Sequence, residues 1–233
     1  MKLLRSTAAV AAIAIGAGFA VSAKDTSEEM RDVGSFDQVQ LNGSMDVEVK
    51  VGGEQSVRVV ADSDIISHIE TEVRGGTLRV GLDNDHRHGN IKKMIVYVTV
   101  PSLKGAALHG SGDMIVEDAV ADDFEVDLHG SGDMTLKDVK FGEVELELQG
   151  SGDIEIDGTC DAVEVELQGS GDIEADDMKC KSATVSVHGS GDVSVTASEE
   201  ADISVHGSGD VVVSGSPDKL RSKVRGSGDI EMR

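Results

Sequence analysis

The sequence predicts an all-β protein: a right-handed parallel β-solenoid (β-helix) with coils of about 20 residues, preceded by a less regular β-rich N-terminal part. The main observation is the phrase Gly-Ser-Gly-Asp, which occurs seven times, beginning at Gly110, Gly130, Gly150, Gly169, Gly189, Gly207 and Gly226. The steps between copies are 20, 20, 19, 20, 18 and 19 residues. Between the copies, apolar and polar residues alternate, which is the period of a strand with one buried face.

The first 23 residues have the features of a secretory signal peptide. Lys2 and Arg5 precede an apolar run over residues 8–20, and Val21-Ser22-Ala23 is a small-residue cleavage site. The run is short for a bilayer-spanning helix. We therefore expect an exported protein, located in the periplasm, on the outer cell surface or in the medium. Residues 24–34 are polar, and we expect a flexible leader there.

Residues 35–105 form the N-terminal β-rich part, with irregularly spaced strands. Strands are predicted over 46–51, 57–60 and 94–100, and Gly75-Gly76 predicts a hairpin within 72–80. A short helical turn is expected at 65–69. The segment Asn42-Gly43-Ser44-Met45-Asp46 looks like a degenerate first copy of the repeat.

Residues 106–233 form the regular Gly-Ser-Gly-Asp repeat solenoid. In the coil of residues 130–149, a tight turn is followed by a strand with Met134 and Leu136 inward. A second turn falls at about 138–142, and then Val144, Leu146 and Leu148 point inward. Each coil therefore supplies about two strands, and successive coils pair in parallel. Glycine suits the corners because it tolerates positive φ and because stacked corners leave no room for a Cβ.

The strand-rich leader, the segment Pro101-Ser102-Leu103 and the repeated Gly-Ser-Gly-Asp together resemble the head GIN domain family. The resemblance covers about residues 35–230, so 35–230 is expected to be one family domain. Members of this family are described as head domains of autotransporter adhesins in bacterial envelopes. The resemblance implies a β-helical fold and an exported location, and it supplies no catalytic residues.

The aspartates of the motif are expected to form a column along the solenoid, because stacking places equivalent residues above one another. Its members are Asp113, Asp133, Asp153, Asp172, Asp192, Asp210 and Asp229. Carboxylates about 4.8 Å apart repel one another unless they accept hydrogen bonds or share cations. Two interpretations remain open, capping of backbone N–H groups and a ladder of calcium sites. Capping is favoured, because calcium-binding β-rolls carry their motif at both turns of a coil and this chain carries it at one.

A second column precedes the motif and contains His109, His129, Gln149, Gln168, His188, His206 and Arg225. Paired histidines on adjacent coils are candidate zinc ligands or acid sensors. The Gln and Arg members favour a polar, outward column instead. A third group, Asp83, Asp85, His86 and His88, has ligand side chains in one loop but lacks a characteristic spacing.

The formal charge of −23 argues against binding to nucleic acid or to anionic membrane surfaces. The outer face of the second strand changes from acidic to basic along the array. In order, its residues are Glu125 and Asp127, Glu145 and Glu147, Glu164 and Glu166, Thr184 and Ser186, and Arg221 and Lys223 in the final coil. This gradient could orient a partner or a second copy of the chain. It could equally limit edge-to-edge growth of the last coil.

The two cysteines, Cys160 and Cys180, are 20 residues apart, which is one coil. Both fall near the second turn, and stacked positions lie within the Cα separation that a disulfide accepts. An exported chain meets an oxidising compartment. We therefore predict a Cys160–Cys180 disulfide that links neighbouring coils.

The sequence contains no nucleophile with its base, no phosphate-binding loop and no zinc-protease signature. We therefore expect a non-enzymatic envelope module without a cofactor, acting in adhesion or matrix interaction. The partner is unidentified, no integral membrane segment is expected after signal removal, and a homo-oligomer is compatible with the sequence. The alternative is a protein that binds calcium through the aspartate column, and a carbohydrate-active enzyme ranks below both.

Overall fold

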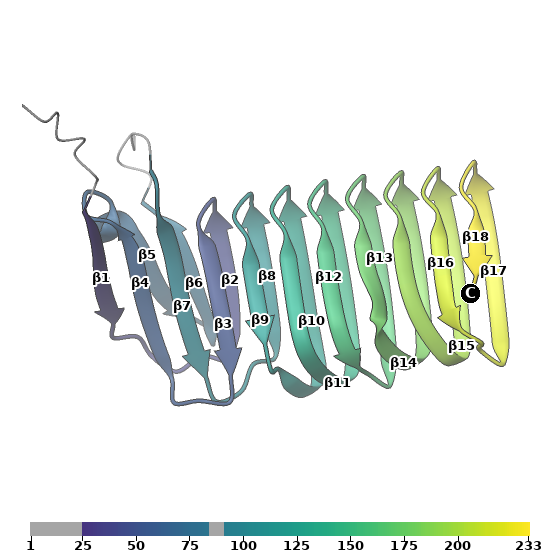
Figure 1. The fold of residues 1–233 in the computed structure, drawn as a ribbon, viewed down its shortest axis with the longest axis horizontal. Coiled ribbons are helices and arrows are strands. Elements are labelled where there is room, and N and C mark those ends of the chain that lie inside the picture. Colours follow the sequence, from purple (N-terminus) through teal and green to yellow (C-terminus); the bar gives the residue numbers. More distant parts are fainter. Residues whose placement is uncertain (1–24, 84–90) are drawn as a thin grey trace, which may run out of the picture.

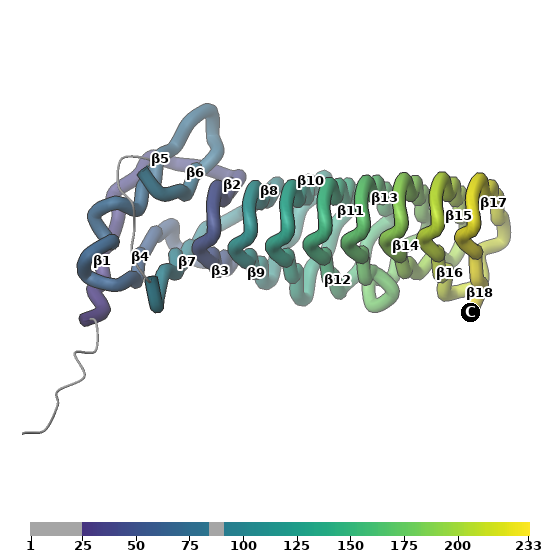
Figure 2. The backbone as a smooth tube through the Cα atoms, turned by 90° about the horizontal axis from the view of Figure 1, so that it is seen from above, coloured from purple at the N-terminus to yellow at the C-terminus, as the bar shows by residue number. Residues whose placement is uncertain are grey.

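The structure is a computed structural model that describes residues 25–83 and 91–233. The expected signal peptide lies outside these residues. The strands stand side by side in one long row, from β1 at the N-terminal end to β17 and β18 at the C-terminal end (Figure 1). Seen from above, the repeat region is a flattened coil of uniform width (Figure 2). Within the described ranges, no helix is long and apolar enough to cross a bilayer.

Two sheets form the opposite walls of the solenoid, and both belong to one continuous hydrogen-bonded network. In the repeat region, sheet I consists of the strands that run into the Gly-Ser-Gly-Asp turn, which we call the motif corner, and sheet II consists of the strands that leave it. At the N-terminal end, further strands extend both sheets. The chain returns from sheet II to sheet I through a second corner. The long strands β11, β14 and β15 bend through this second corner and contribute to both sheets.

The strands of sheet I, in spatial order, are β5 (Ile69–Arg74), β6 (Thr77–Leu82), β2 (Gln38–Gly43), β8 (Gly105–Gly110), β10 (Val120–Gly130), β11 (Met134–Gly150), β13 (Ala162–Gly169), β14 (Ile173–Gly189), β15 (Val193–Gly207) and β17 (Lys219–Gly226). The strands of sheet II are β1 (Thr26–Arg31), β4 (Ser56–Asp62), β7 (Met94–Val100), β3 (Asp46–Val51), β9 (Met114–Glu117), β11, β12 (Ile154–Thr159), β14, β15, β16 (Val211–Gly215) and β18 (Ile230–Met232). A short 3-10 helix covers Ile66–His68.

The core is a narrow stack of aliphatic side chains between the two sheets. Alternate residues of the inner strands are buried, as the period of two requires, whereas β1 and β17 at the two ends have no buried residue. In the coil of residues 130–149, Met134 and Leu136 of sheet II and Val144, Leu146 and Leu148 of sheet I are all buried. Their positions recur in register through the parallel pairings of β11 with its neighbours. The predicted β-solenoid is therefore confirmed.

The first coil is formed by β2 and β3, and it stacks directly on the coil formed by β8 and β9. Gly43 pairs with Gly110, so the degenerate copy at 42–46 takes the place of a motif corner. Residues 52–104 therefore leave the array after one coil and return to it. Their strands cover the N-terminal end, where β6 and β7 pair in parallel with the first coil and β5 and β4 pair antiparallel outside them.

One expectation was wrong. Residues 24–34 were expected to be a flexible leader, but β1 occupies Thr26–Arg31 and pairs antiparallel with β4. The strand is polar because it is an edge strand with mostly exposed side chains. Its attachment comes from backbone hydrogen bonds with β4 and from ion pairs such as Arg58–Glu28, at 3.3 Å. Alternation of apolar residues, the usual signal for a strand, is absent from such a segment.

The disulfide between Cys160 and Cys180 is present, with Cα atoms 4.5 Å apart. Both cysteines are buried and lie at the second corner of adjacent coils. The backbone N–H of Cys160 donates to the carbonyl of Lys179 at 3.0 Å, so the two coils are also hydrogen-bonded next to the bridge. The predicted pairing is confirmed.

Candidate functional site

Neighbouring motif corners are packed backbone against backbone. Gly150 has φ of +146°, in the region that favours glycine. A Cβ on Gly150 would lie 2.0 Å from the carbonyl oxygen of Gly130, and one on Gly152 would lie 1.9 Å from that of Gly132. The N–H of Ser151 donates to the carbonyl of Gly130 at 2.9 Å. The first glycine is therefore required by conformation and by crowding, and the second by crowding.

The predicted aspartate column exists, and its carboxylates face solvent. The Oδ1 atom of each aspartate accepts a hydrogen bond from the backbone N–H of the aspartate one coil further on. The donor–acceptor distances run from 3.3 Å between Asp113 and Asp133 to 2.7 Å between Asp210 and Asp229. Asp46 of the first coil extends the column by accepting from Asp113 at 3.3 Å. This arrangement supports the capping interpretation, because one oxygen of each acceptor already has a protein donor.

The second column is also formed, on the outer face of sheet I. Its neighbours pair in register, as His109 with His129 and His188 with His206. The imidazole rings of each pair are stacked, with centroids 4.9 Å apart in both. Asn42 of the first coil precedes His109 in the same column.

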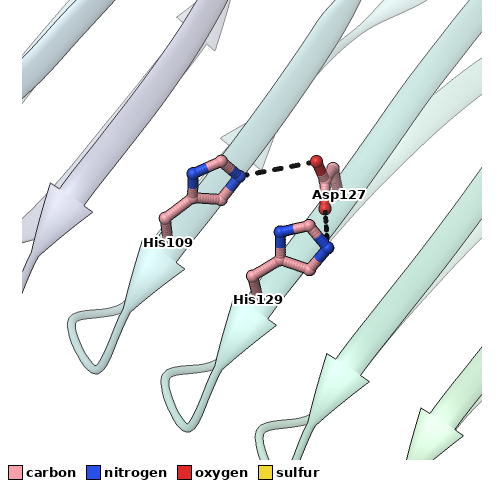
Figure 3. A group of neighbouring side chains, drawn as sticks. All are labelled: His109, Asp127 and His129. Atoms are coloured by element: carbon pink, nitrogen blue, oxygen red, sulfur yellow. Dashed lines mark hydrogen bonds and ion pairs between the residues drawn. The ribbon is translucent and has the colours of Figure 1, made fainter.

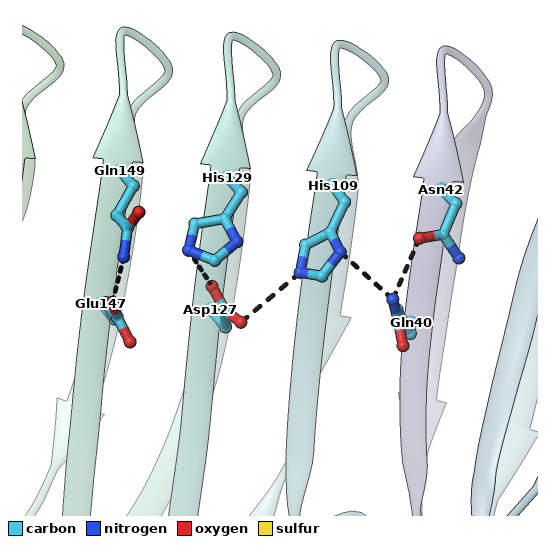
Figure 4. A network of polar contacts seen from close by, with 7 residues as sticks. All are labelled: Gln40, Asn42, His109, Asp127, His129, Glu147 and Gln149. Atoms are coloured by element: carbon cyan, nitrogen blue, oxygen red, sulfur yellow. Dashed lines mark hydrogen bonds and ion pairs between the residues drawn. The ribbon is translucent and has the colours of Figure 1, made fainter.

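Asp127 joins the first histidine pair into a cluster. It lies two residues before His129 and therefore on the same face of β10. Its carboxylate lies beside the Nε2 edges of both rings, with Oδ2 at 3.5 Å from Nε2 of His109 and Oδ1 at 3.4 Å from Nε2 of His129 (Figure 3). The ring of His109 also contacts Gln40, whose Nε2 lies 3.2 Å from Nδ1 (Figure 4).

The structure describes only one member of the third group of candidate ligands. Asp85, His86 and His88 lie outside the described residues. Asp83 is described, and its Oδ2 lies 2.8 Å from Nδ1 of His68, the last residue of the 3-10 helix. The Asp83 carboxylate therefore has a histidine partner on a neighbouring element of the N-terminal part.

The outer face of sheet I carries the predicted charge gradient. Glu125, Glu145 and Glu164 lie in register on adjacent strands, and Asp202 pairs with Arg221 near the C-terminal end. The basic last strand is tied back by ion pairs, since Nη1 of Arg221 lies 2.7 Å from Oε1 of Glu200. The face is therefore acidic over β10, β11 and β13 and basic over β17.

A shallow hollow of about 530 Å³ opens over the acidic part of this face. Carboxylates, among them Glu125, Glu145 and Glu164, outnumber the other polar groups of its lining, which include Lys104 and Thr184. Burial raises the pKa of Glu145, and the neighbouring Glu164 and Glu125 raise it further by repulsion. The hollow therefore concentrates negative charge that is only partly solvated.

The sequence predicts that both histidine pairs lie in one column, but the prediction did not connect Asp127 with the pair His109 and His129. Asp127 was counted among the outer acidic residues of its strand. The spacing Asp-x-His in a strand was the available signal, because residues two apart share a face. The later pair has Ser186 and Ser204 at the corresponding positions.

The sequence profile of the family described as "Putative auto-transporter adhesin, head GIN domain" matches residues 35–217. No curated protein matches the chain. A solved structure from Bacteroides fragilis, described as a putative adhesin, is 24% identical, with a TM-score of 0.83 over 91% of this chain and 98% of that one. A "Putative lipid binding protein" from Parabacteroides distasonis is also 24% identical, with a TM-score of 0.72 over 90% and 97%.

A putative adhesin from Parabacteroides merdae is 18% identical, with a TM-score of 0.70 over 89% of this chain and 96% of that one. At these identities the likeness to solved structures shows a shared fold. The profile match covers most of the chain and includes the first coil, the inserted strands and six of the seven motif corners. The chain therefore belongs to the head GIN domain family.

Proposed function

We propose that this chain is an exported, non-enzymatic binding module of the bacterial envelope that adheres through the outer face of sheet I. The observation that carries the proposal is the continuous, charge-graded surface of that sheet. Parallel stacking holds its outward side chains in straight rows, so the surface is flat and preorganised. Such a surface suits an extended partner better than a small substrate.

The partner chemistry follows from the sign of the charge. Glu125, Glu145 and Glu164 line the hollow together with further acidic side chains, which favours a partner with a basic surface. The basic strand β17 at the far end then sets the orientation, because a misaligned basic partner would meet like charges. A second copy of the chain, with its own basic end, is one partner of this kind.

Three observations support export and a role outside the cytoplasm. The N-terminal sequence has the features of a signal peptide, the structure contains a disulfide, and the family is described as an adhesin head. The absence of a catalytic motif from the sequence supports a non-enzymatic role. The aspartate column acts in this proposal as part of the scaffold.

Cell fractionation followed by surface-binding measurements tests the proposal. We expect the processed chain outside the cytoplasm and expect it to bind a basic matrix protein or surface in a salt-sensitive manner. A double variant, Glu145→Gln with Glu164→Gln, should weaken binding. The matched control removes two carboxylates from the outer side of sheet II, Glu155→Gln with Glu174→Gln, and should leave binding unchanged. Equal effects of both variants, or binding that ignores salt, would contradict the assignment of the face.

A further inference from the structure

The geometry points to a transition-metal site formed by His109, Asp127 and His129 on the outer face of sheet I, with zinc as the ion it fits. One ligand atom from each residue lies within 4.8 Å of the other two. Two imidazole nitrogens and one carboxylate oxygen form a donor set that zinc accepts in proteins. The site is separate from the aspartate column of the motif corners.

The distances fit a tetrahedral ion. Ligand bonds of about 2.0–2.1 Å in a tetrahedral zinc site place the ligand atoms roughly 3.4 Å apart. Oδ2 of Asp127 lies 3.5 Å from Nε2 of His109, and Oδ1 lies 3.4 Å from Nε2 of His129, so each ring faces its own carboxylate oxygen at about this spacing. To close around one ion, the carboxylate would turn to bring one oxygen toward both nitrogens, and the nitrogens, which lie within 4.8 Å of each other, would move closer. The fourth position stays open to water.

The cluster also has unmet bonding capacity. Asp127 Oδ1 and His129 Nε2 are both shielded from solvent, and within the described part of the chain they face each other at 3.4 Å without a hydrogen bond. Shielded polar atoms without a hydrogen bond are costly, and they are uncommon in folded proteins. A metal ion between these two atoms would satisfy both.

The scaffold holds the ligands in place. His109 and His129 are paired on adjacent parallel strands, and Asp127 is on the same strand as His129. The rings are 37% and 38% exposed, so an ion from solution can reach them, whereas the Asp127 side chain is 24% exposed. Sites on strands are more precise than sites on loops, because the backbone fixes the separation of the ligands.

Neighbouring amides can complete the site. A histidine that binds metal through Nε2 carries its proton on Nδ1 and needs an acceptor there. Gln40 lies 3.2 Å from Nδ1 of His109, and its amide contacts Asn42 at 2.9 Å (Figure 4). Turning both amides over presents Gln40 Oε1 to the ring and leaves the heavy atoms where they are. Gln40 then serves as the acceptor that fixes the imidazole.

The chain contains its own control. His188 and His206 form a second stacked pair, in the same column and with the same centroid separation of 4.9 Å. Their strands carry Ser186 and Ser204 where β10 carries Asp127. Burial lowers the pKa of His206, and so do His188, Arg225 and Lys223. This pair therefore lacks the carboxylate and lies among cationic groups that repel a metal ion.

Calorimetric zinc titration of the full chain without a polyhistidine tag tests the inference. We expect one tightly bound zinc ion per chain, a higher melting temperature with zinc, and no competition from calcium. Cobalt in place of zinc should give the strong visible absorption of a tetrahedral ion. Loss of one ligand should weaken zinc binding at least about tenfold. Even the loss of a residue that only supports a ligand typically weakens metal binding about 10–100-fold, so loss of the ligand itself should cost no less.

The variants are chosen from residues that the same columns already accommodate. His129→Gln places in the column the residue found at 149 and 168, and Asp127→Ser reproduces the position of Ser186 and Ser204. Both should fold, as circular dichroism and thermal melting would show, and both should lose the tight site. The double variant His188→Gln with His206→Gln should retain it. The inference is overturned if the titration finds no stoichiometric site, or if binding survives His129→Gln and disappears in the control.

Discussion

The two corners of each coil solve the same geometrical problem in different ways. At the motif corner the sequence is constant, and neighbouring backbones are so close that a single added carbon would overlap a carbonyl oxygen. At the second corner the sequence changes from coil to coil. Some of these second corners contain residues with positive φ, at Asp118, Asp138, Gly158, Gly215 and Ser216. The Cys160–Cys180 bridge joins two neighbouring second corners.

The second corner also absorbs all variation in coil length. In sheet I, the number of residues from the first paired residue of the strand to the motif glycine is the same in these coils, as from Glu143 to Gly150 and from Ala162 to Gly169. The number of residues from that glycine to the first paired residue of sheet II is also constant. The steps of 18, 19 and 20 residues therefore differ only between sheet II and the next strand of sheet I. One corner sets the register, and the other is free to vary.

The largest effect is expected from Gly152→Ala at the motif corner. Its methyl group would overlap the carbonyl of Gly132, so we expect a loss of more than about 4 kcal/mol in unfolding free energy, or failure to fold. Denaturant unfolding measures the loss. The control is Gly34→Ala, where an added Cβ meets nothing within 4 Å. A Gly152→Ala protein as stable as this control would refute the view that crowding fixes the corner.

At the second corner, the disulfide is expected to have the next largest effect. Replacing Cys160 and Cys180 together with alanine should lower the unfolding free energy by about 3 kcal/mol, because the unfolded chain regains the freedom of a loop of about 20 residues. Chemical denaturation with and without reductant provides the measurement. Reductant should destabilise the native chain and leave the double variant unchanged. Two freely alkylated thiols in the exported native protein would contradict the bridge itself.

Removing one member of the aspartate column should have a moderate effect. Asp153→Ala removes the acceptor for the N–H of Asp172, at 2.9 Å, so we expect a loss of about 0.5–1.5 kcal/mol. At the second corner, Asp161→Ala breaks the exposed ion pair with Lys181, at 2.6 Å, and should cost less. If the column caps backbone groups, the melting temperature of the zinc-free protein should be the same in calcium and in chelator. A stoichiometric calcium-dependent rise would instead establish the alternative function.

Lengthening the second corner should have little effect. A glycine inserted between Glu199 and Glu200 extends the shortest of these turns toward the length of its neighbours, and we expect a cost below about 1 kcal/mol. The same insertion between Ser151 and Gly152 would displace a motif glycine from its stack and should prevent normal folding. Thermal melting of the two insertion variants makes the comparison. Equal tolerance at both places would remove the distinction between the corners.

The smallest effect is expected on the face between the corners. The raised pKa of Glu145 means that the folded state disfavours its charged form. Its contribution to stability is therefore most favourable below the ordinary carboxyl pKa and declines as pH rises through the folded-state value. Glu145→Gln should slightly raise the melting temperature at neutral pH and match the native chain in acid. A pH series of melting curves reads this difference, and a destabilised variant at neutral pH would contradict it.

Much of the fold could be predicted because the determining signals are local. The bounds of β3 and β7 follow from apolar alternation, and the hairpin of β5 and β6 follows from Gly75-Gly76. The disulfide follows from the coil period. The position of the first coil could be inferred only from the weak copy at 42–46. The return of the chain after the inserted strands depends on non-local pairing, which leaves no periodic trace in the sequence.

The candidate site was less predictable. The columns follow directly from stacking, and the structure contains them as expected. The role of Asp127 depends on how its carboxylate lies across two strands, which is a matter of side-chain geometry. The hydrogen bond between each aspartate and the next coil likewise depends on the shape of the turn. The identity of the residues is readable from the sequence, whereas their contacts are not.

The bridge between two coils has a mechanical consequence. Hydrogen bonds between coils run along the long axis, so tension applied to the C-terminus would load them one coil at a time and peel strands from the β17 and β18 end. Peeling could proceed as far as Cys180, where a covalent link holds the next coil closed. The bridge would then pass the tension from Cys180 directly to Cys160, so the residues between the two cysteines would stay closed in a loop and could not extend. The disulfide therefore shortens the length to which a pulled chain can be stretched.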